Sequence, residues 1–448
     1  MLDSSPVVDS ALETPRTPGW FETHKSLWQA TAIEPPTLAP LDSSTQADVV
    51  VIGGGYLGLS CALRLAERGA DVVLLDAVAP GFGASGRNGG QVIPGLKYDP
   101  DELIAMYGAQ AAEPIIDFAA HAPDRVFAIV ERHAIDCDPV REGWIQGAHS
   151  SAMLRAVEAR AKQWRVRGAD VELLAPEELT RRIGCAPGLY CGGWLDRRAG
   201  SVQPLSFARG LARAAQRHGA RLYAPARATG IGRTGQRWSV TIDGADGGAQ
   251  VHASHVVIAT NAYSDGLWPR LRSTVIPAQS FQVATDPLPD TLRDTILRNR
   301  EVVSDARRLL HYYRLDAAGR LVIGGRGTMS SPTRDSDFEH IRRALAKTFP
   351  VLAGVHLPYF WSGRLAMTQD SLPHLHQPVP GVTIALGCNG RGLALTTAVG
   401  ERIAEHLLDD ARHPLPFPTS PLKPIPLHGL HRGYVTALIQ YYKLLDLF

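Results

Sequence analysis

The clearest pattern of hydrophobic and polar positions lies near the start of the chain. A mainly apolar run from Ala47 to Ile52 is followed by a glycine-rich turn and by apolar residues at helical spacing that end at Gly69. A second apolar run, Asp71 to Asp76, comes next. Short apolar runs joined by one helix are typical of strands buried on both faces of a parallel sheet. This segment therefore predicts a βαβ unit.

The rest of the chain alternates between helical and strand patterns. Residues 101–182 have a mainly helical pattern, which the segment 200–204 interrupts. The further elements that we expect are a helix at 205–218, strands at 221–223 and 255–259, a hairpin around 237–242, a β-rich stretch at 280–325, a strand at 381–386 and a helix at 394–408. Segments of two kinds alternate along the chain, which predicts two interleaved domains rather than two consecutive ones.

The composition narrows the classes of protein. A length of 448 residues is enough for two domains, and a formal net charge of +2 gives no reason to expect a nucleic-acid partner. The five cysteines are scattered without metal-site spacing, so we expect no metal and a reducing compartment. No run reaches the ~18 apolar residues of a membrane span, and the first residues lack the basic, apolar start of a secretory signal. We therefore expect a cytoplasmic protein without a membrane span.

The glycine-rich turn carries the first chemical signal. Its sequence is Gly53-x-Gly55-x-x-Gly58, with Tyr56 and Leu57 between the last two glycines. In this motif the glycines allow a tight turn, a close approach of the backbone to a pyrophosphate, and close packing of helix on strand. Asp76 follows Gly58 at the end of the second strand, where a carboxylate binds ribose hydroxyls. A chance glycine turn is the alternative, but the flanking strand, helix and acid favour a dinucleotide site.

Two further glycine-rich segments bear on the choice between NAD and FAD. Residues 81–91 follow the second strand, and residues 387–396 precede the last helix of the body. Glycine lets a backbone lie against a flat ligand, and the N-terminus of a helix stabilises negative charge. A reduced flavin carries such a charge, so both segments favour FAD.

At these segments the sequence resembles the D-amino acid oxidase-like (DAO) superfamily of FAD-dependent oxidoreductases, and most closely its gamma-glutamylputrescine oxidase branch. The resemblance runs from the Trp28 region through GASGRNGGQ (83–91), Ala259-Thr-Asn-Ala262 and Trp361-Ser-Gly363 to the closing helix. It implies that Ala228 gives backbone contacts to adenine and that residues 390–393 face the pyrimidine end of the flavin. The cofactor-binding residues expected from motif and resemblance together are Gly53, Gly55, Tyr56, Leu57, Gly58, Asp76, Ser85, Gly86, Arg87, Asn88, Gly89, Gly90, Gln91, Ala228, Thr260, Asn261, Gly363, Gly387, Asn389, Gly390, Arg391, Gly392 and Leu393.

The predicted fold class is α/β, with a Rossmann-type FAD-binding domain interleaved with a smaller α+β substrate domain built on an antiparallel sheet. We expect an irregular N-terminal arm at 1–45 that carries Trp20, Phe21 and Trp28. The expected FAD-binding segments are 46–99, 200–275 and 360–412, and the expected substrate-binding segments are 100–199 and 276–359. The tail, 413–448, is expected to contain a docked helix from His428 onward, because apolar residues recur there at helical spacing.

The segment after Trp361 departs from its relatives at two positions. Amino acid oxidases of this family carry G-x-R-P, whose arginine binds the substrate carboxylate, and the matching position here is Leu365. Arg364 is out of step by one residue. Gly363 stands where members with a thioether-linked flavin have cysteine. The resemblance therefore implies non-covalent FAD and a site without the usual carboxylate clamp.

Three candidate catalytic residues, His311, Tyr313 and Arg326, lie on strands that the resemblance places against the flavin. The fourth candidate, for a role in the pocket, is Trp361. Side chains alternate along a strand, so only one of Tyr312 and Tyr313 faces the substrate. The alternatives are structural roles, namely core packing for the aromatic residues and a solvated face for the arginines.

The expected reaction is FAD-dependent oxidation of the C–N bond of a primary or secondary amine. The resulting imine hydrolyses to an aldehyde or ketone, and oxygen reoxidises the cofactor to give hydrogen peroxide. The alternatives are an amino acid oxidase, an amine dehydrogenase that passes electrons to a quinone or a protein, and a non-catalytic flavin-binding protein. The expected partners are the amine and the electron acceptor, and a homo-oligomer is left open.

Overall fold

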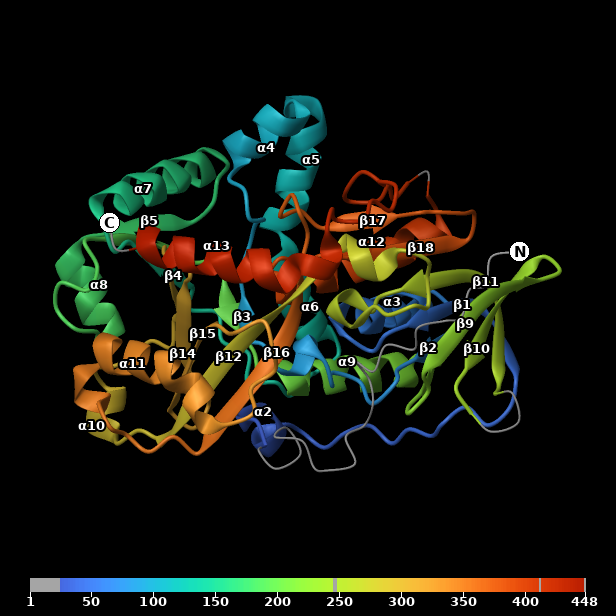
Figure 1. Cartoon of the computed structure of the whole chain (residues 1–448), viewed down its shortest axis with the longest axis horizontal. Helices are drawn as coiled ribbons and strands as arrows, with labels where there is room; N and C mark the ends of the chain where they lie inside the picture. The colour runs from blue at the N-terminus through green and yellow to red at the C-terminus, as the bar shows by residue number, and fades with distance from the viewer. Residues whose placement is uncertain (1–24, 245–247, 411, 447–448) are drawn as a thin grey trace.

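The computed structural model describes residues 25–446 apart from 245–247 and 411, so Trp20 and Phe21 lie outside the described residues. A first eight-stranded sheet has the order β17-β18-β11-β1-β2-β8, and the β9–β10 hairpin joins it along β11 (Figure 1). β1 pairs in parallel with β2 and β11, as the βαβ pattern predicts. The strands are β1 (Thr45–Ile52), β2 (Val72–Leu75), β8 (Arg221–Tyr223), β9 (Ala228–Thr234), β10 (Arg237–Ile242), β11 (Gln250–Ile258), β17 (His374–His376) and β18 (Val382–Leu386).

Helices α3 (Tyr56–Glu67), α9 (Pro204–Arg217) and α12 (Gly392–Leu408) pack together over this sheet. α3 contacts both α9 and α12, and most of its residues are buried. A Cβ atom at Gly400 would lie 2.1 Å from Ser60 Oγ and 2.3 Å from Leu57 O. Glycine at this position therefore lets α12 approach the backbone of α3.

The second sheet also has eight strands, in the order β16-β12-β15-β14-β13-β4-β6-β5. Neighbouring strands are antiparallel except for the parallel pair β13–β4. The strands are β4 (Trp144–Gly147), β5 (Val171–Leu174), β6 (Gly193–Asp196), β12 (Ile276–Pro287), β13 (Val302–Asp305), β14 (His311–Leu315), β15 (Arg320–Arg326) and β16 (Tyr359–Met367). The predicted pairing of a Rossmann-type domain with a substrate domain on a mainly antiparallel sheet is confirmed. A short ribbon of β3 (Gln91–Val92) and β7 (Gly200–Ser201) links the two regions.

One face of the second sheet forms a core with α8 (Pro176–Ile183) and α11 (Glu339–Thr348). Phe281 from β12 and Tyr313 from β14 are buried in this core. The remaining helices of the body are α4 (Pro100–Tyr107), α5 (Ala109–Ala120), α6 (Ala122–Arg132), α7 (Ser151–Val166) and α10 (Asp290–Arg293).

The structure departs from the expected elements in three places. Residues 101–182 contain β4 and β5 as well as helices, because strands of four residues are too short to show clear alternation beside long helical patterns. α6 packs against α12 over the first sheet, although its segment was expected in the substrate domain. β16 pairs along its whole length with β12 and therefore belongs to the second sheet, although it begins the segment 360–412.

The described part of the N-terminal arm is partly ordered as a short helix, α2 (Leu27–Thr31), although an irregular arm was expected. Ser26 caps this helix through a hydrogen bond from the N–H of Gln29. Trp28 is fully buried beside Trp361, with the two ring planes at 76°. The arm therefore inserts an aromatic anchor between the two domains.

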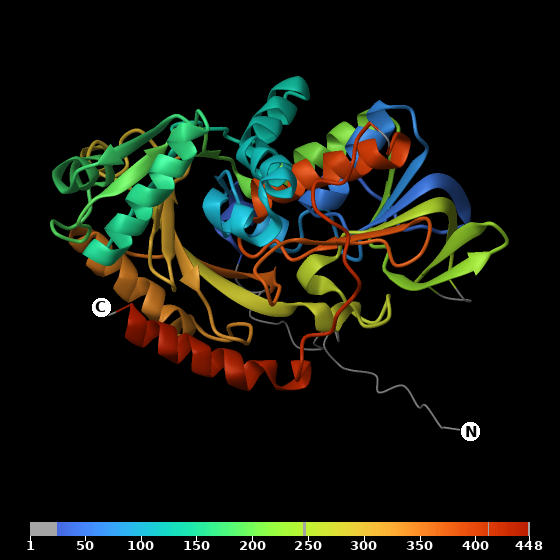
Figure 2. The ribbon, with the colours of Figure 1, turned by 90° about the horizontal axis from the view of Figure 1, so that it is seen from above.

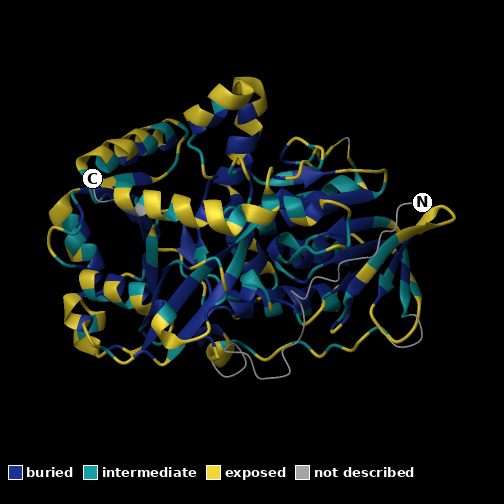
Figure 3. Cartoon of the chain, viewed as in Figure 1, coloured by how far each residue is buried: buried dark blue, intermediate teal, exposed yellow. Residues whose placement is uncertain are grey.

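The tail ends in α13 (His431–Leu445), which runs along the outside of the molecule (Figure 2). Val435 is buried and Ile439 and Tyr442 are half-buried, whereas Leu438 is exposed. Much of the outer surface of the helix is exposed (Figure 3). The carboxylate of Asp446 accepts hydrogen bonds from the N–H groups of Arg308 and Leu309 and so ties the end of the helix to the body. Among the described residues, no helix has the length and apolar character needed to cross a membrane.

Candidate active site

The glycine turn after β1 closes over the N-terminus of α3. A Cβ at Gly58 would lie 1.9 Å from Gly53 O, and Gly53 itself has φ +111°, so both positions require glycine. Asp76, just beyond β2, accepts hydrogen bonds from the N–H groups of Gly54 (2.7 Å) and Val78 (2.9 Å). Burial raises the pKa of Asp76, and these backbone donors oppose that rise. The turn, the helix N-terminus and the carboxylate thus lie together at the carboxyl ends of parallel strands, where dinucleotides bind.

Residues 81–91 form a loop that crosses this helix N-terminus. Ser85 Oγ accepts a hydrogen bond from the N–H of Tyr56, the first residue of α3. The Asn88 side chain donates to the Tyr56 hydroxyl and to the carbonyls of Ala84 and Ser85, and its Oδ1 accepts from Gly90 N. The structure therefore uses the Asn88 side chain to shape the loop, and Gly86 lies in the short 3₁₀ turn of the same loop.

Three successive carbonyls of this loop are held by buried donors from distant segments. Arg87 O accepts from Trp361 Nε1 (3.0 Å) and also from the amide of Gln282. Asn88 O accepts from Trp28 Nε1 (2.8 Å), and Gly89 O accepts from Arg314 Nε (2.8 Å). The arm and the second sheet thus fix the backbone that faces the site.

We call the side chains that donate to these three carbonyls the clamp, and Arg314 is the largest charged member of it. Its guanidinium is fully buried, donates also to Val202 O (2.8 Å) and lies 4.9 Å from the centre of the Trp28 ring. Burial lowers its pKa to about 10, so it remains charged at neutral pH. A Cβ at Gly90 would lie 2.2 Å from Val202 O, which explains a glycine there. The Gln91 side chain donates to Val303 O in the second sheet (3.0 Å).

The second glycine loop, residues 387–393, lies at the N-terminus of α12. Asn261 Oδ1 accepts from Gly387 N (3.0 Å), and Asn389 Oδ1 accepts from Thr368 N (2.9 Å). A Cβ at Gly390 would meet no atom within 4 Å, so the loop presents bare backbone to open space there. Gly392 begins α12 and Leu393 is buried in the core.

Arg391, in the same loop, points toward the second domain. Its Nη1 donates to Pro94 O (3.0 Å), and its guanidinium lies 5.4 Å from the centre of the Trp144 ring. Burial lowers its pKa to about 10. The side chain of Arg391 thus links the loop to β4, and only its backbone belongs to the loop surface.

A cavity joins the first glycine turn to this second loop. Its lining residues include Gly55, Tyr56, Leu57, Ser85, Asn261 and Cys388. Thr260 lies next to the turn and its hydroxyl pairs with Ser264 Oγ (2.7 Å). Ala228, at the start of β9, is buried beside Ile242 on the hairpin strand β10.

The second sheet presents a polar row to the 81–91 loop. Tyr312 hydroxyl pairs with Ser280 Oγ (2.7 Å), and a Cβ at Gly89 would lie 2.8 Å from the Tyr312 ring. Ser280 stands opposite both Arg326 on β15 and Gly363 on β16, so all three share one face of the sheet. A Cβ at Gly363 would lie 3.2 Å from Arg87 Cβ. This face is the wall of the site.

Tyr313 and His311 lie on the other face of the same sheet. The Tyr313 hydroxyl pairs with Tyr190 (3.2 Å), and its ring packs edge-on against Phe349 in the core under α8 and α11. His311 Nδ1 lies 3.5 Å from Asp305 Oδ2. The alternation of side chains separates these residues from Tyr312, and the sequence did not reveal which set faces the loop. Trp361 is on the loop side but is fully buried between the arm and the loop.

Sequence reasoning missed Gln282 and the roles of Trp28 and Arg314 in holding the loop carbonyls, and it left open whether Tyr312 or Tyr313 faces the site. A single arginine on an apolar strand carries no signal of its own, and a solvated face was one of the alternatives for it. The structure shows that Arg314 lies in the buried half of its strand, next to Tyr313 and Leu315.

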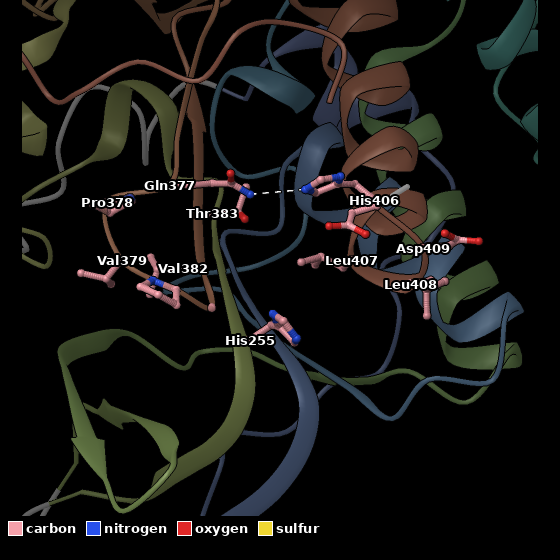
Figure 4. Close-up of a pocket in the computed structure, with 13 residues that line it drawn as sticks. His255, Gln377, Pro378, Val379, Val382, Thr383, His406, Leu407, Leu408 and Asp409 are labelled. Atoms are coloured by element: carbon pink, nitrogen blue, oxygen red, sulfur yellow. Dashed lines mark hydrogen bonds between the residues drawn. The ribbon is translucent and has the colours of Figure 1, made fainter. Parts of the chain in front are cut away.

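A wider hollow of about 510 Å³ lies elsewhere, between β11, the start of β18 and the end of α12. Figure 4 shows His255, Val382 and Thr383 on one side of it and His406 and Leu407 on the other. The glycine turn follows the carboxyl end of β1, whereas this hollow lies toward the amino end of β18. Ligands of open α/β sheets bind at the carboxyl ends, so the hollow is separate from the nucleotide site.

The fold and the site define a class, the Rossmann-type flavoenzymes with an interleaved substrate domain. Residues 48–406 match the family DAO, described as FAD dependent oxidoreductase. The chain is 34% identical over 429 residues to gamma-glutamylputrescine oxidoreductase of Escherichia coli (strain K12), covering 95% of this chain and 99% of that protein. It is also 34% identical over 395 residues to the probable oxidoreductase OrdL of Rhizobium meliloti (strain 1021), covering 88% and 89% of the two chains.

Solved structures share the fold at lower identity. Glycine oxidase from Geobacillus kaustophilus matches with a TM-score of 0.68 and 23% identity, covering 86% of this chain and 99% of that one. L-proline dehydrogenase from P. horikoshii matches with a TM-score of 0.69 and 20% identity, covering 83% and 96%. The chain belongs to the DAO family of FAD-dependent oxidoreductases.

The residues of the site fit FAD. Asp76 has the place after β2 at which the dinucleotide motif puts an acid for the ribose, and the N-terminus of α3 has the place of the anion site of that motif. The open backbone at Gly390, beside the N-terminus of α12, leaves room for the edge of a flat ring.

Proposed function

We propose that this enzyme oxidises the C–N bond of a primary or secondary amine. The substrate carbon loses a hydride and the nitrogen loses a proton, which leaves an imine that water hydrolyses to an aldehyde or ketone. FAD, when bound, accepts the two electrons, and oxygen then takes them up to give hydrogen peroxide. The similarity to a protein named gamma-glutamylputrescine oxidoreductase supports an amine with a second polar group at a distance.

FAD would be held without a covalent bond. Gly363 offers no nucleophilic side chain on the strand that faces Arg87. Asp76 would hold the ribose, the N–H groups at the start of α3 would hold the phosphates, and the loop around Gly390 would face the ring. The second sheet would supply the opposite wall.

The arrangement of arginines on the second sheet carries the substrate proposal. Leu365 lies two residues after Gly363 on the same face of β16, where no charge is offered to a carboxylate. Arg364 lies over the Tyr263 ring, 5.4 Å from its centre, and Arg314 is used by the loop carbonyls. An α-carboxylate at the Leu365 position would lose its hydration without gaining a paired cation, which is costly.

Arg326 remains as the cation for a distant anionic or amide group. It shares the wall with Ser280, burial lowers its pKa, and among the described residues it has no carboxylate within ion-pair distance. We therefore assign Arg326 to recognition of the remote end of the substrate. Tyr312 replaces Tyr313 as the proposed tyrosine of the pocket, and Trp361 is a positioning residue that holds Arg87 O.

The test compares initial rates of peroxide formation for three substrate classes: neutral amines, amines with a distant carboxylate, and α-amino acids. Amines should exceed α-amino acids in kcat/KM by at least about tenfold, or ~1.4 kcal/mol. Arg326→Gln should lower kcat/KM about tenfold for the carboxylated amine and leave the neutral amine unchanged. The control Arg364→Gln should leave kcat/KM unchanged for both the carboxylated and the neutral amine. A best rate with an α-amino acid would overturn the proposal.

Anaerobic mixing with substrate distinguishes the remaining alternatives. An oxidase bleaches and then recovers its yellow colour in air. A dehydrogenase bleaches but recovers only with a quinone or dye, which would correct the acceptor and leave the amine chemistry in place. A protein that never bleaches with any of the three classes would refute the catalytic assignment.

A further inference from the structure

Three helices of the first domain end at one place on the surface. Glu67 is the last residue of α3, His133 follows the last residue of α6, and His218 follows the last residue of α9. One ligand atom from each of these three side chains lies within 4.8 Å of the other two. The cluster is separate from the glycine turn, which lies at the opposite end of α3.

The chemistry of the three side chains suits a transition-metal ion. Two imidazoles and one carboxylate are a common donor set for Zn²⁺, which leaves one position to water. His133 Nε2 lies 2.9 Å from Glu67 Oε1, and the rings of His133 and His218 have centres 5.4 Å apart. Small rotations of the exposed His218 side chain would bring all three donors to the separation that one ion requires.

Two further observations point to a ligand at this cluster. The His133 side chain is only 5% exposed, yet its Nε2 makes no hydrogen bond of acceptable geometry among the described residues. The C-termini of α3, α6 and α9 also bring three negative dipole ends to the same place, and these ends favour a cation.

Nearby arginines lower the affinity that this cluster can have for a metal cation. Arg64 and Arg132 both pair with Glu67, at 3.1 and 3.4 Å, and Arg217 donates to His133 O. Arg64 is shared with Glu405 at 3.1 Å, and the Arg132 side chain is 47% exposed and free to turn into solvent. The site can therefore accept a dication by displacing Arg132, with an affinity below that of a site without neighbouring cations.

We propose that Glu67, His133 and His218 form a binding site for a divalent transition metal of the Zn²⁺ class that joins the ends of α3, α6 and α9. The three ligands are far apart in sequence, so the ion binds the folded chain and stabilises it. The site lies outside the flavin site and is independent of the amine chemistry.

The experiment titrates EDTA-treated, FAD-loaded enzyme with ZnCl₂ against a chromogenic zinc indicator. The wild type should bind one equivalent, and zinc should raise its melting temperature by a few degrees. His218→Gln, an exposed substitution, should weaken binding at least tenfold, because loss of an outer-shell partner alone costs about tenfold or more, and should abolish the thermal shift. His133→Gln should do the same if it folds. The matched control His356→Gln, an exposed histidine paired with Asp286, should behave as the wild type.

Cobalt(II) in place of zinc separates this site from the free cysteines. Binding at the cluster should give a visible spectrum without the thiolate charge-transfer band. Equal zinc affinity for the wild type and His218→Gln, no bound zinc, or a thiolate band as the only signal would each overturn the proposal.

Discussion

The clamp on the 81–91 loop gives a sharp test through Arg314→Met. Methionine keeps much of the volume of the side chain but leaves the carbonyls of Gly89 and Val202 buried without their donors. Each unpaired buried carbonyl costs ~1–3 kcal/mol, and relief of the buried charge returns a part of this. We therefore expect a loss of ~2–5 kcal/mol in the free energy of unfolding, together with weaker FAD binding because the loop backbone faces the site.

Urea denaturation of the apoprotein measures the first effect, and titration of the apoprotein with FAD measures the second. Arg233→Met is the matched control, because Arg233 also lies over a tryptophan, 4.5 Å from the centre of the Trp238 ring, but on the exposed hairpin. Loss of the contact between Arg233 and Trp238 should lower the free energy of unfolding by less than ~1 kcal/mol. If Arg314→Met destabilised the protein no more than this control and bound FAD with unchanged affinity, the clamp would have no energetic role.

Three further predictions test other parts of the structure. Asp76→Ala should weaken FAD binding by ~1–3 kcal/mol in a titration of the apoprotein, since it removes the ribose acceptor, and undiminished affinity would exclude that role. Acid precipitation should release the flavin into the supernatant, and yellow colour in the pellet would show a covalent link. Truncation after Pro426 removes Val435 and Asp446 from the body and should lower the melting temperature; an unchanged temperature and oligomer size would show that α13 is dispensable.

The sequence predicted best what depends on local patterns. β1, α3 and β2 follow directly from two apolar runs and a glycine motif, and the structure places Asp76 beside Gly54 as the motif requires. The short strands β4 and β5 were missed because four residues give too little periodicity.

The walls of the site were harder to predict because they depend on tertiary pairing. The orientation of Tyr312 and Tyr313 is fixed by the register of β14 on β15 and by the helices on one side of the sheet. Neither the register nor the position of the helices can be predicted from the residues around the two tyrosines. The burial of Trp28 depends on a surface created by residues more than fifty positions away. Such contacts appear only when the whole chain is assembled.

The clamp on the loop carbonyls has a consequence for the order of biosynthesis. Its donors come from Trp28, Arg314 and Trp361, so the backbone cradle of the loop is complete only after the ribosome has passed residue 361. The second glycine loop, around Gly390, emerges later still. The nascent N-terminal βαβ unit therefore leaves the ribosomal exit tunnel long before the segments that complete the FAD site are synthesised. We expect FAD to bind only after the whole chain has been synthesised.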